Sequence, residues 1–449
     1  MNRTLLGPRV VIAGTHSGVG KTTVATGLMA ALRHAGDRPA AAKVGPDFID
    51  PGYHSLATGR PPRNLDAWLC GPEAMAPLCR RAGENADILV IEGVMGLFDG
   101  ANDGGVSSTA DVARLLGAPV VLVVDASAMA GSVAATVHGF ATWDPVSRVE
   151  GVILNRVGSP THEALLREAL EGSGVAVLGA LGRDDRLTWR DRHLGLVPVA
   201  EDRASVEQRL DILSHVIATS VDLAGIRRIA AGAAQMSAGA VNLPPQVGSL
   251  RVGVASGAAF NFTYTDTIDA LVAAGAEIIP FDPLFDPALP VGIDGLLVGG
   301  GFPEVYAGQL ADNERLLADL RHRVTAGLTT WAECGGLLLL CRSLDGRPMA
   351  GVVPTDGALT TKLTLGYRNV LTRRPSPVGP TNTAWRGHEF HYSAVEPGGD
   401  ALALSSRWGT GEEGWATPSL LATYVHHHPG GDPAAIEQFV MTCRANGMP

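Results

Sequence analysis

Short apolar runs alternate with amphipathic stretches along the first half of the chain. The apolar runs are continuous rather than interrupted by polar residues, which is typical of parallel strands buried on both faces. Stretches of helical period separate them, and this order predicts a doubly wound, mostly parallel α/β sheet. We predict strands at Arg9–Ala13, Ala40–Val44, Asp87–Glu92, Pro119–Val124 and Gly151–Leu154, and helices at Lys21–Ala35, Ser108–Leu116 and Thr161–Gly172.

The texture of the sequence changes near residue 230. Ile229–Asn242 is rich in Ala, Gly and Ser, and two prolines follow at Pro244 and Pro245. The α/β pattern then begins again, with predicted strands at Arg251–Ala255, Ala276–Pro280, Gly295–Val298 and Thr329–Ala332. We therefore predict two doubly wound domains, residues 1–230 and 249–449, joined by a linker at residues 231–248.

Composition narrows the class of protein. The formal net charge is −10 and no basic stripe is present, which disfavours nucleic-acid binding. No apolar run approaches the roughly 20 residues of a membrane helix. Five cysteines without metal-ligand spacing suit a reducing compartment, and the first predicted strand begins too early for a signal peptide. We expect a cytoplasmic protein that binds neither nucleic acid nor membrane.

A glycine-rich segment joins the first predicted strand to the first predicted helix. Its glycines allow backbone N–H groups to surround phosphate oxygens, and the helix N-terminus adds positive potential. Lys21 would reach the β- and γ-phosphates of ATP, and the Thr22 hydroxyl would ligate Mg²⁺. The alternative is a tight strand-to-helix turn that binds no nucleotide. The first glycine, Gly14, also stands one residue earlier than the strict phosphate-loop pattern requires. The predicted nucleotide-binding residues are Gly14, Thr15, Gly18, Gly20, Lys21, Thr22 and Thr23.

Acidic residues follow the next predicted strands. Asp47 lies in Lys43–Gly52 after the second strand, and Glu92 begins a Gly-rich segment after the third. Ligands of open α/β sheets gather at the carboxyl ends of the strands, so we predict that Asp47 and Glu92 hold Mg²⁺ together with Thr22. A helix cap or turn is the alternative for a single Asp. Asn155 ends a later strand, and its amide could read the adenine edge.

A cysteine follows a predicted strand of the second domain. Cys334 precedes Gly335 and Gly336, which predicts a sharp strand-to-helix turn that presents a nucleophile. The helix N-terminus is expected to lower the pKa of this thiol. A small buried hydrophobic residue is the alternative. Consecutive glycines after the strand Gly295–Val298 could present N–H groups to an oxyanion, and the predicted oxyanion residues are Gly300, Gly301 and Gly335.

Two histidine-rich segments accompany this cysteine. A thiol nucleophile needs a base, and the run Tyr424–His428 offers three imidazoles, although such a triplet could also be solvated or bind metal adventitiously. The segment Gly387–Ser393 contains His388, Glu389 and His391, but its spacing does not fit a zinc metalloprotease. We therefore favour a cysteine–histidine pair over a zinc site.

Six segments in order resemble the cobyrinic or hydrogenobyrinic acid a,c-diamide synthases over almost the whole chain. The N-terminal half is similar to the dethiobiotin-synthetase group of P-loop enzymes, which share the displaced first glycine, and the C-terminal half is similar to class I glutamine amidotransferases. The segments are Lys43–Gly52, Glu92–Gly100, Gly299–Glu304, Ala332–Gly336, His388–Ser393 and Tyr424–His426.

This resemblance implies an ATP- and glutamine-dependent ligase. Cys334 would form a thioester with glutamine and release ammonia, and His426 matches the family's base. ATP with Mg²⁺ would phosphorylate a carboxylate of the corrin-type ring, ammonia would displace the phosphate, and the cycle would repeat on a second acetate. Lys43, Asp50 and Asp99 would lie with Asp47 near the carboxylate that is activated. The family also implies a homodimer whose partners are small molecules, namely the ring acid and L-glutamine.

Two departures from the family pattern leave questions open. Ala332 replaces a glycine before the nucleophile, and His428 stands where the usual triad has glutamate, so the third triad role is open and His428 could fill it. Amidation of another tetrapyrrole, such as nickel sirohydrochlorin, is the nearest alternative. A partitioning ATPase would need lysine at the position of His16, and an inactive glutaminase would not need both Cys334 and His426.

Overall fold

The computed structural model describes residues 4–101, 105–184, 186, 189, 191–192 and 195–447. The chain divides into two compact units, residues 1–241 and 242–449. The division falls inside the predicted linker. Helix α9 (Leu223–Ala231) ends where that linker was expected to begin, and a short strand β11 (Ser237–Ala238) then pairs with β1 (Thr4–Leu5).

The sheet of the first unit is parallel throughout and has the order β4-β3-β5-β2-β6-β7-β8. The predicted parallel sheet is therefore confirmed, and β4 and β8, which were not predicted, extend its two edges. Both have weak strand signals, because β4 has only three residues and β8 is rich in Gly and Ala. The bounds are β2 Arg9–Gly14, β3 Pro39–Val44, β4 Arg63–Leu65, β5 Ile88–Glu92, β6 Val120–Asp125, β7 Val149–Val157 and β8 Ala176–Gly182.

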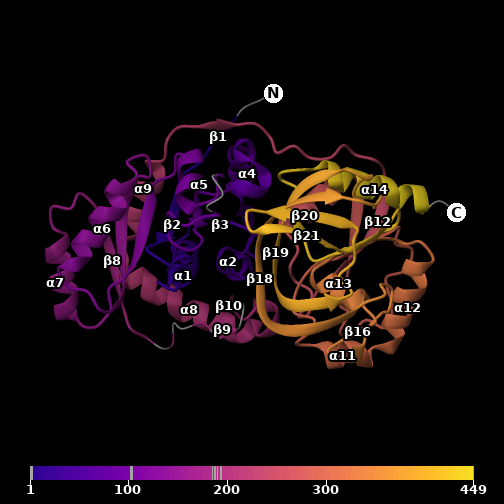
Figure 1. Ribbon diagram of the computed structural model, residues 1–449. Coiled ribbons are helices and arrows are strands. Elements are labelled where there is room, and N and C mark those ends of the chain that lie inside the picture. The colour runs from indigo at the N-terminus through magenta and orange to yellow at the C-terminus, as the bar shows by residue number, and fades with distance from the viewer. Residues whose placement is uncertain are drawn as a thin grey trace. The chain divides into compact units, whose positions relative to one another are not determined.

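Helices cover both faces of this sheet. Helices α1, α2 and α8 pack together on one face and α4, α5 and α9 lie on the other, as Figure 1 shows. Their bounds are α1 Lys21–His34, α2 Asp50–Thr58, α3 Ala67–Cys70, α4 Met75–Ala82, α5 Thr109–Leu115, α6 Ser132–Trp143, α7 Pro160–Leu170 and α8 Arg203–Ser220. Short elements complete the unit: η1 Pro72–Ala74, β9 Asp191–Arg192, β10 Gly195–Leu196 and η3 Val199–Glu201.

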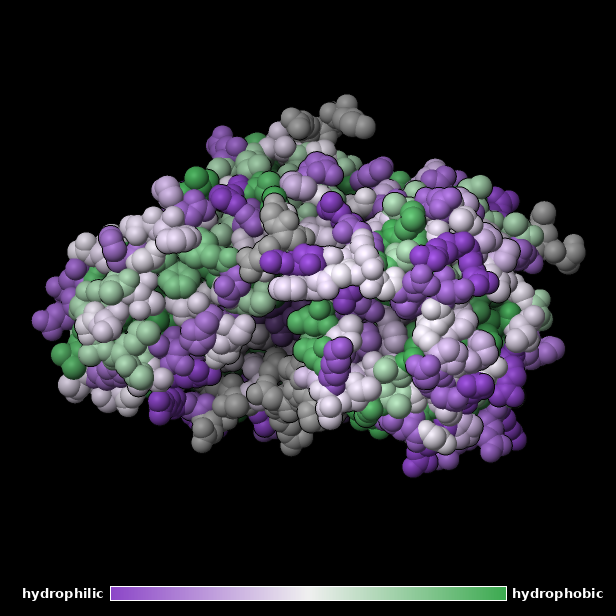
Figure 2. Space-filling view, viewed as in Figure 1, coloured by the Kyte–Doolittle hydropathy of each residue, from purple (hydrophilic) through white to green (hydrophobic). Residues whose placement is uncertain are grey.

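Local sequence explains where several helices begin. Ser108 and Asp111 form a capping box at the start of α5, and the Ser159 side chain caps α7 just before Pro160. Helix α6 differs from the others, since only Val133 and Val137 among its twelve residues are buried. Figure 2 shows pale green, weakly hydrophobic atoms gathered over α6. This helix therefore presents a partly apolar surface to solvent.

The second unit contains two sheets. The first has the order β13-β12-β14-β15-β23-β22, parallel except for the edge strand β22. Helices α10 and α14 pack on one face of it, and the core cluster on the other face includes residues of α11, α12 and α13. The bounds are β12 Leu250–Ala255, α10 Thr265–Ala273, β13 Ala276–Phe281, β14 Gly295–Val298, α11 Ala307–Asp312, α12 Glu314–Thr325, β15 Thr329–Glu333, α13 Gly335–Leu340, β22 Trp415–Thr417, β23 Leu420–Thr423 and α14 Ala434–Asn446.

The second sheet is built around a long antiparallel pair, β18 and β19, which curves through the orange part of Figure 1. The order is β17-β16-β18-β19-β24, with β20 and β21 attached to β18. The bounds are β16 Ser343–Leu344, β17 Arg347–Pro348, β18 Asp356–Thr372, β19 Ala384–Glu396, β20 Leu402–Ser406, β21 Gly409–Glu413 and β24 His426–His427.

Across the described part of the chain, the helices are too short or too polar to cross a bilayer.

Candidate functional site

The phosphate-binding loop follows β2, the strand at the centre of the first sheet. Strand β2 ends at Gly14 and α1 begins at Lys21. Gly20 has φ +96°, and a Cβ at this position would collide with the side chain of Asn155, so only glycine fits. The buried Lys21 donates to the His16 carbonyl at 3.2 Å. Burial and the nearby Lys43 lower the pKa of Lys21 to about 8, so an arriving phosphate would favour its charged form.

Asn155 and its neighbour support this loop from β7. The Asn155 amide N–H donates to the Val19 carbonyl at 2.7 Å, and its Oδ1 accepts the Arg156 N–H at 2.9 Å. Arg156 in turn donates to the Gly18 carbonyl at 2.9 Å. Both ends of the Asn155 amide are therefore engaged within the protein. These contacts make Asn155 a support of the loop, and its contact with adenine stays a prediction.

A buried cluster of oxygen and nitrogen atoms lies beside the loop. The Thr22 hydroxyl lies 2.7 Å from Glu92 Oε1 and 3.2 Å from Asp50 Oδ2. The Lys43 ammonium donates to Asp50 at 2.6 Å, to Glu92 at 3.0 Å and to the Gly93 carbonyl at 3.1 Å. The ends of β3 and β5 and the starts of α1 and α2 bring these groups together.

Asp47 does not take the predicted place in this cluster. Its Oδ1 accepts the N–H groups of Ile49 and Asp50, at 2.7 and 3.1 Å, and its Oδ2 stays 3.9 Å from the Lys43 ammonium. This is the turn-forming role that a single Asp after a strand often has. Asp50, three residues further, is the carboxylate beside Thr22, whereas the metal-ligand role of Asp47 stays a prediction.

His54 completes the cluster and was missed in the sequence. Its Nε2 lies 2.6 Å from Glu92 Oε2, and both side chains are fully buried. The available signal was its position four residues after Asp50 on α2, which places both on one face of a helix. The pattern of apolar runs did not draw attention to it.

The charges of the cluster balance one another. Burial alone would raise the pKa of Glu92, but Lys43 and His54 hold it below its ordinary value. Burial and the Asp47 carboxylate raise the pKa of Asp50. Burial alone would lower the pKa of Lys43, but Asp50 and Glu92 outweigh it and raise that pKa. Within the cluster, Lys43 thus supplies the positive charge that faces Asp50 and Glu92.

The donor set fits Mg²⁺. One hydroxyl and two carboxylates converge, whereas no group of three or more His, Cys, Asp and Glu suited to a metal is found among the described residues. Mg²⁺ is usually held by one or two carboxylates, water and substrate phosphates. Thr22, Asp50 and Glu92 would therefore hold the ion only together with the phosphates of a nucleotide.

The loop that follows β5 carries Asp99 toward the same region. The Leu97 N–H donates to the Gly14 carbonyl at 2.9 Å, and Asp99 Oδ2 accepts the Gly96 N–H at 2.9 Å. Asp99 is exposed and contributes to the electrostatic environment of Lys21. The loop thus contacts the phosphate-binding loop and carries an exposed carboxylate.

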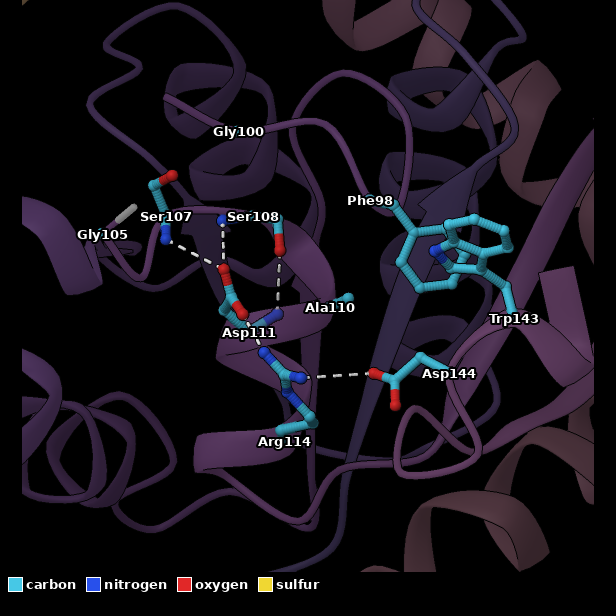
Figure 3. Close-up of a pocket in the computed structure, with 10 residues that line it drawn as sticks. All are labelled: Phe98, Gly100, Gly105, Ser107, Ser108, Ala110, Asp111, Arg114, Trp143 and Asp144. Carbon is cyan, nitrogen blue, oxygen red and sulfur yellow. Dashed lines mark hydrogen bonds and ion pairs between the residues drawn. The ribbon is translucent and has the colours of Figure 1, made fainter. Parts of the chain in front are cut away.

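A cavity of about 530 Å³ opens next to Asp99 (Figure 3). Phe98 and Trp143 line one side, and Phe98 stacks on Phe140 at 5.6 Å between ring centroids. The other side carries Arg114, which pairs with Asp111 and lies 3.4 Å from Asp144. The cavity therefore combines two aromatic side chains with a polar side on which the Arg114 cation is already paired. Sequence reasoning did not predict it.

The cysteine of the second unit lies on the predicted sharp turn. Strand β15 ends at Glu333, α13 begins at Gly335, and Cys334 between them has φ +50°, which is unusual for a residue with a side chain. Its N–H donates to the Thr423 carbonyl at 2.7 Å. A Cβ on Gly336 would collide with the Val298 carbonyl. Neighbouring backbone therefore holds the turn, and small residues are required beside it.

The expected lowering of the thiol pKa is wrong for this structure. Burial, followed by the carboxylate of Glu304, raises the pKa of Cys334, and the Gly335 N–H opposes this only in part. Helix α13 has six residues and a small dipole, and desolvation outweighs it. The thiol therefore needs a base to become a nucleophile.

Strands β14, β15 and β23 are neighbours and parallel, so the segments that follow them meet at one edge of the sheet. This brings the glycines after Val298, Cys334 and His426 together, as predicted. A Cβ on Gly300 would lie 2.5 Å from His426 Cε1, which shows how closely the ring rests on that glycine. The Gly300 N–H donates to the Phe262 carbonyl at 3.1 Å. Gly300 therefore does not offer a donor to an oxyanion, and this part of the prediction is corrected.

The Glu333 carboxylate lies beside His426, whereas His428 has other neighbours. Glu333 Oε2 lies 3.5 Å from His426 Nδ1, and its Oε1 accepts the His427 N–H at 3.1 Å. His428 Nδ1 instead accepts the Gly430 N–H at 3.0 Å, and its ring packs on Tyr264 at 4.4 Å. The prediction for His428 is corrected accordingly. No spacing rule in the sequence pointed to a glutamate directly before the nucleophile.

The segment His388–Ser393 lies on β19 beside this base. The His388 ring lies 5.0 Å from that of His426, and its Nε2 lies 3.1 Å from the Tyr264 hydroxyl. Glu389 pairs with Arg368 at 2.5 Å, and His391 stacks on Tyr424 at 3.8 Å. Burial and the neighbouring His426 hold the pKa of His388 well below its usual value. This segment therefore packs around the base with neutral or paired groups.

Comparison with known proteins defines the class and then the family. Residues 10–197 match the CobQ/CobB/MinD/ParA nucleotide binding domain, and residues 251–434 match the CobB/CobQ-like glutamine amidotransferase domain. The protein is thus an amidating enzyme that joins a nucleotide-binding domain to a glutamine amidotransferase domain. It belongs to the hydrogenobyrinate/cobyrinate a,c-diamide synthase family.

Three relatives illustrate this membership. The hydrogenobyrinate a,c-diamide synthase of Streptomyces coelicolor is 47% identical, over 98% of each chain. The enzyme of the same name from Mycobacterium tuberculosis is 43% identical, over 97% of this chain and 98% of its own. The cobyrinate a,c-diamide synthase of Synechocystis is 39% identical, over 97% of this chain and 93% of its own.

Proposed function

We propose that this protein uses ATP and glutamine to convert the a and c acetate carboxylates of hydrogenobyrinate, a corrin-type ring acid of cobalamin biosynthesis, into amides. The observation that carries the proposal is the presence in one chain of the Thr22–Asp50–Glu92 cluster and of the turn at Cys334, next to the Glu333–His426 pair. A carboxylate does not accept ammonia without activation. A phosphate site that makes an electrophile and a thiol site that makes ammonia meet that need as a pair.

In the ATP half, the reaction is a phosphoryl transfer to carboxylate. Lys21 and the backbone of Gly14–Gly20 bind the phosphates, and Mg²⁺ supplies charge neutralisation on their oxygens. A ring carboxylate oxygen attacks the γ-phosphorus, ADP leaves, and an acyl phosphate forms. Ammonia then attacks the acyl carbon and phosphate leaves. Lys43 and Asp99 are the proposed residues that position the carboxylate that reacts.

In the glutaminase half, His426 takes the proton of the Cys334 thiol, and the sulfur attacks the amide carbon of glutamine. The proton is passed to the leaving nitrogen, ammonia departs, and water hydrolyses the thioester to glutamate. The raised pKa of Cys334 supports this order, because the thiol is not ionised before its base acts. Gly301 and Gly335 are the proposed oxyanion donors.

The ring face is proposed to contact the cavity of Figure 3. Asp99, which is placed to meet the reacting carboxylate, directly follows Phe98 in the wall of this cavity. Aromatic side chains such as Phe98 and Trp143 present flat apolar surface that suits a conjugated macrocycle. Trp143 is 78% exposed, so it is accessible to a large ligand.

Hydrogenobyrinate, which lacks cobalt, is proposed ahead of cobyrinate. The relatives named for hydrogenobyrinate are 43–47% identical to this chain, whereas those named for cobyrinate are 38–40% identical. We further propose a cytoplasmic homodimer with ATP- and substrate-binding residues 1–230 and glutaminase residues 249–449. The exposed, partly apolar α6 supports self-association, and light scattering at several protein concentrations measures it.

One experiment tests this function. Purified protein is incubated with ATP, Mg²⁺, glutamine and either hydrogenobyrinic acid or cobyrinic acid, and mass spectrometry follows the loss of about one mass unit for each amide formed. Cys334→Ala runs alongside with glutamine or with ammonium. We expect a diamide from hydrogenobyrinic acid, and a variant that works only with ammonium. Glutamine hydrolysis without amidation of either ring would contradict the proposed substrate. Other tetrapyrrole acids, such as nickel sirohydrochlorin, would then be tested as substrates.

A further inference from the structure

We propose that Glu333 is the positioning residue that orients His426 during glutamine hydrolysis. The inference rests on the proposed glutaminase function. It concerns a role that the sequence left open, because His428 stands where the usual triad has glutamate. Glu333 directly precedes the nucleophile Cys334, so one short segment carries both the acid and the thiol.

The carboxylate of Glu333 is held in place before His426 acts. The side chain is almost fully buried, and its Oε1 accepts the N–H of His427, the residue after the base, at 3.1 Å. Its other oxygen, Oε2, lies 3.5 Å from His426 Nδ1. This separation is longer than a hydrogen bond, but catalytic hydrogen bonds are often long without substrate and shorten in the working complex.

The position of Glu333 selects one tautomer of the base. An acceptor beside Nδ1 favours a proton on Nδ1 and leaves the Nε2 lone pair to receive the thiol proton. When His426 becomes an imidazolium, the same carboxylate stabilises its charge. The proton that leaves sulfur ends on Nε2, Glu333 stays ionised, and the proton later departs with ammonia. This is the relation between acid, base and nucleophile that other triads achieve with a differently placed acid.

Other charged and titratable groups around the base have different partners. Glu389 is paired with Arg368, His388 is bonded to Tyr264, and His428 accepts from Gly430. Burial lowers the pKa of His427 to about 4, with Glu333 opposing the shift. Burial and the Glu304 carboxylate raise the pKa of Cys334. Glu333 Oε2 lies 3.5 Å from His426 Nδ1.

The substitution Glu333→Gln separates positioning from packing. The Gln side chain keeps an oxygen that accepts the His427 N–H, so the contribution of residue 333 to packing and folding is retained. Its other group is an NH₂, which donates to Nδ1 and forces the proton onto Nε2, where it blocks the base. Glu333→Asp retains a carboxylate at greater distance and serves as the conservative variant. Glu413→Gln removes another buried carboxylate of the same unit and serves as the matched control.

The readouts are glutamine-dependent and ammonium-dependent amidation, glutamate release, and the rate of Cys334 alkylation by iodoacetamide from pH 6 to 10. For Glu333→Gln we expect glutamate release to fall by roughly 10²–10⁴-fold, slower alkylation at neutral pH, and unchanged ammonium-dependent amidation. Glu333→Asp should recover part of the loss, and Glu413→Gln should keep the wild-type pH profile.

Two results would overturn the proposal. One is a Glu333→Gln variant with glutamate release and a pH profile within about twofold of wild type. The other is an equal loss in the glutamine and ammonium reactions, which would mean general misfolding, and circular dichroism of the variant checks this. A wild-type protein that fails to release glutamate would instead overturn the proposed glutaminase function, so the two failures are distinguishable.

Discussion

His54 Nε2 lies 2.6 Å from Glu92 Oε2 in a region where neither side chain has any exposed surface. Glu92 uses its other carboxylate oxygen toward Thr22 and Lys43. The histidine therefore fixes the rotation of a carboxylate whose far oxygen faces the proposed Mg²⁺ position. Such partners of metal ligands orient the ligand and tune its charge.

Replacing His54 tests this orientation. In His54→Ala the Glu92 carboxylate loses its partner, and we expect ammonium-dependent amidation to fall by roughly 10–100-fold with a higher Mg²⁺ requirement. His54→Gln, which can still donate to Glu92, should recover much of the activity. Steady-state rates over a Mg²⁺ series provide the measurement. Equal activity in the Ala variant and wild type would show that His54 has no role in orienting Glu92.

Asp50 and Asp47 are expected to respond differently to loss of charge. Asp50→Asn removes a carboxylate from the Thr22–Glu92 cluster, so ATP-dependent amidation should fall by roughly 100-fold or more. Asp47→Asn keeps an oxygen for the N–H groups of Ile49 and Asp50 and should stay within a few-fold of wild type. Amidation rates with ammonium measure both. A larger loss of activity in Asp47→Asn than in Asp50→Asn would instead support Asp47 as the metal ligand.

Asn155→Ala distinguishes loop support from base reading. Loss of the bond to the Val19 carbonyl should weaken ATP binding by about fivefold, because one hydrogen bond contributes roughly 1 kcal/mol. The preference for ATP over GTP should not change. Calorimetric titration of both nucleotides measures this. A variant that binds ATP and GTP equally would instead support the adenine contact predicted from the sequence.

Trp143→Ala tests the proposed contact with the ring. We expect a higher KM for hydrogenobyrinic acid, with the KM for ATP unchanged, because the side chain lines the cavity rather than the phosphate loop. Trp408→Ala is the matched control, since Trp408 is 82% exposed in the other unit. Equal effects of the two substitutions, or none, would place the ring elsewhere.

Glu413 gives the stability of the protein a defined pH dependence. Burial raises its pKa to about 8, although the Thr423 hydroxyl and the Tyr424 N–H oppose this. The folded state holds a proton that the unfolded chain releases near pH 4.5, so this contribution is complete below pH 4.5 and is lost as the pH rises through about 8.

Glu413→Gln should abolish that loss. The Gln oxygen can still accept the Tyr424 N–H, its NH₂ group faces the Thr423 hydroxyl, and its neutral amide does not titrate. We expect the melting temperature of wild type to fall relative to the variant between pH 6 and 9, measured by scanning fluorimetry. Glu412→Gln, at a neighbouring position whose carboxylate is about half exposed, is the control. Parallel curves for wild type and Glu413→Gln would contradict the assignment.

Much of the fold and of the site was predictable because parallel strands impose strong rules. Buried strands read as continuous apolar runs, and the residues that follow them meet at one edge of the sheet. This was enough to predict that Gly14–Thr23 and Glu92 would lie together, whereas the pairing of Cys334 with His426 was implied by the family resemblance. The long pair β18–β19 had no such signal, because most of β18 is exposed and not apolar.

The roles of individual site residues depended on hydrogen bonds and burial that the spacing of residues in the sequence does not determine. Asp47 and Asp50 are three residues apart, and only the turn captured by Asp47 decides which carboxylate faces Thr22. The pKa of Cys334 depended on the balance between a short helix and deep burial, and burial was not visible in the local motif. The Gly300 N–H was predicted to bind an oxyanion, but it donates to the backbone carbonyl of Phe262, a residue distant in sequence.

The sheet order that joins β15 to β23 also has a consequence during protein synthesis. The ribosome delivers Cys334 well before His426, with β16 to β22 made in between. A nascent chain that stops between them has its thiol without its base and without β23, the strand that pairs with β15. An incomplete chain is therefore not expected to consume glutamine, whereas its nucleotide-binding unit is already synthesised and free to fold.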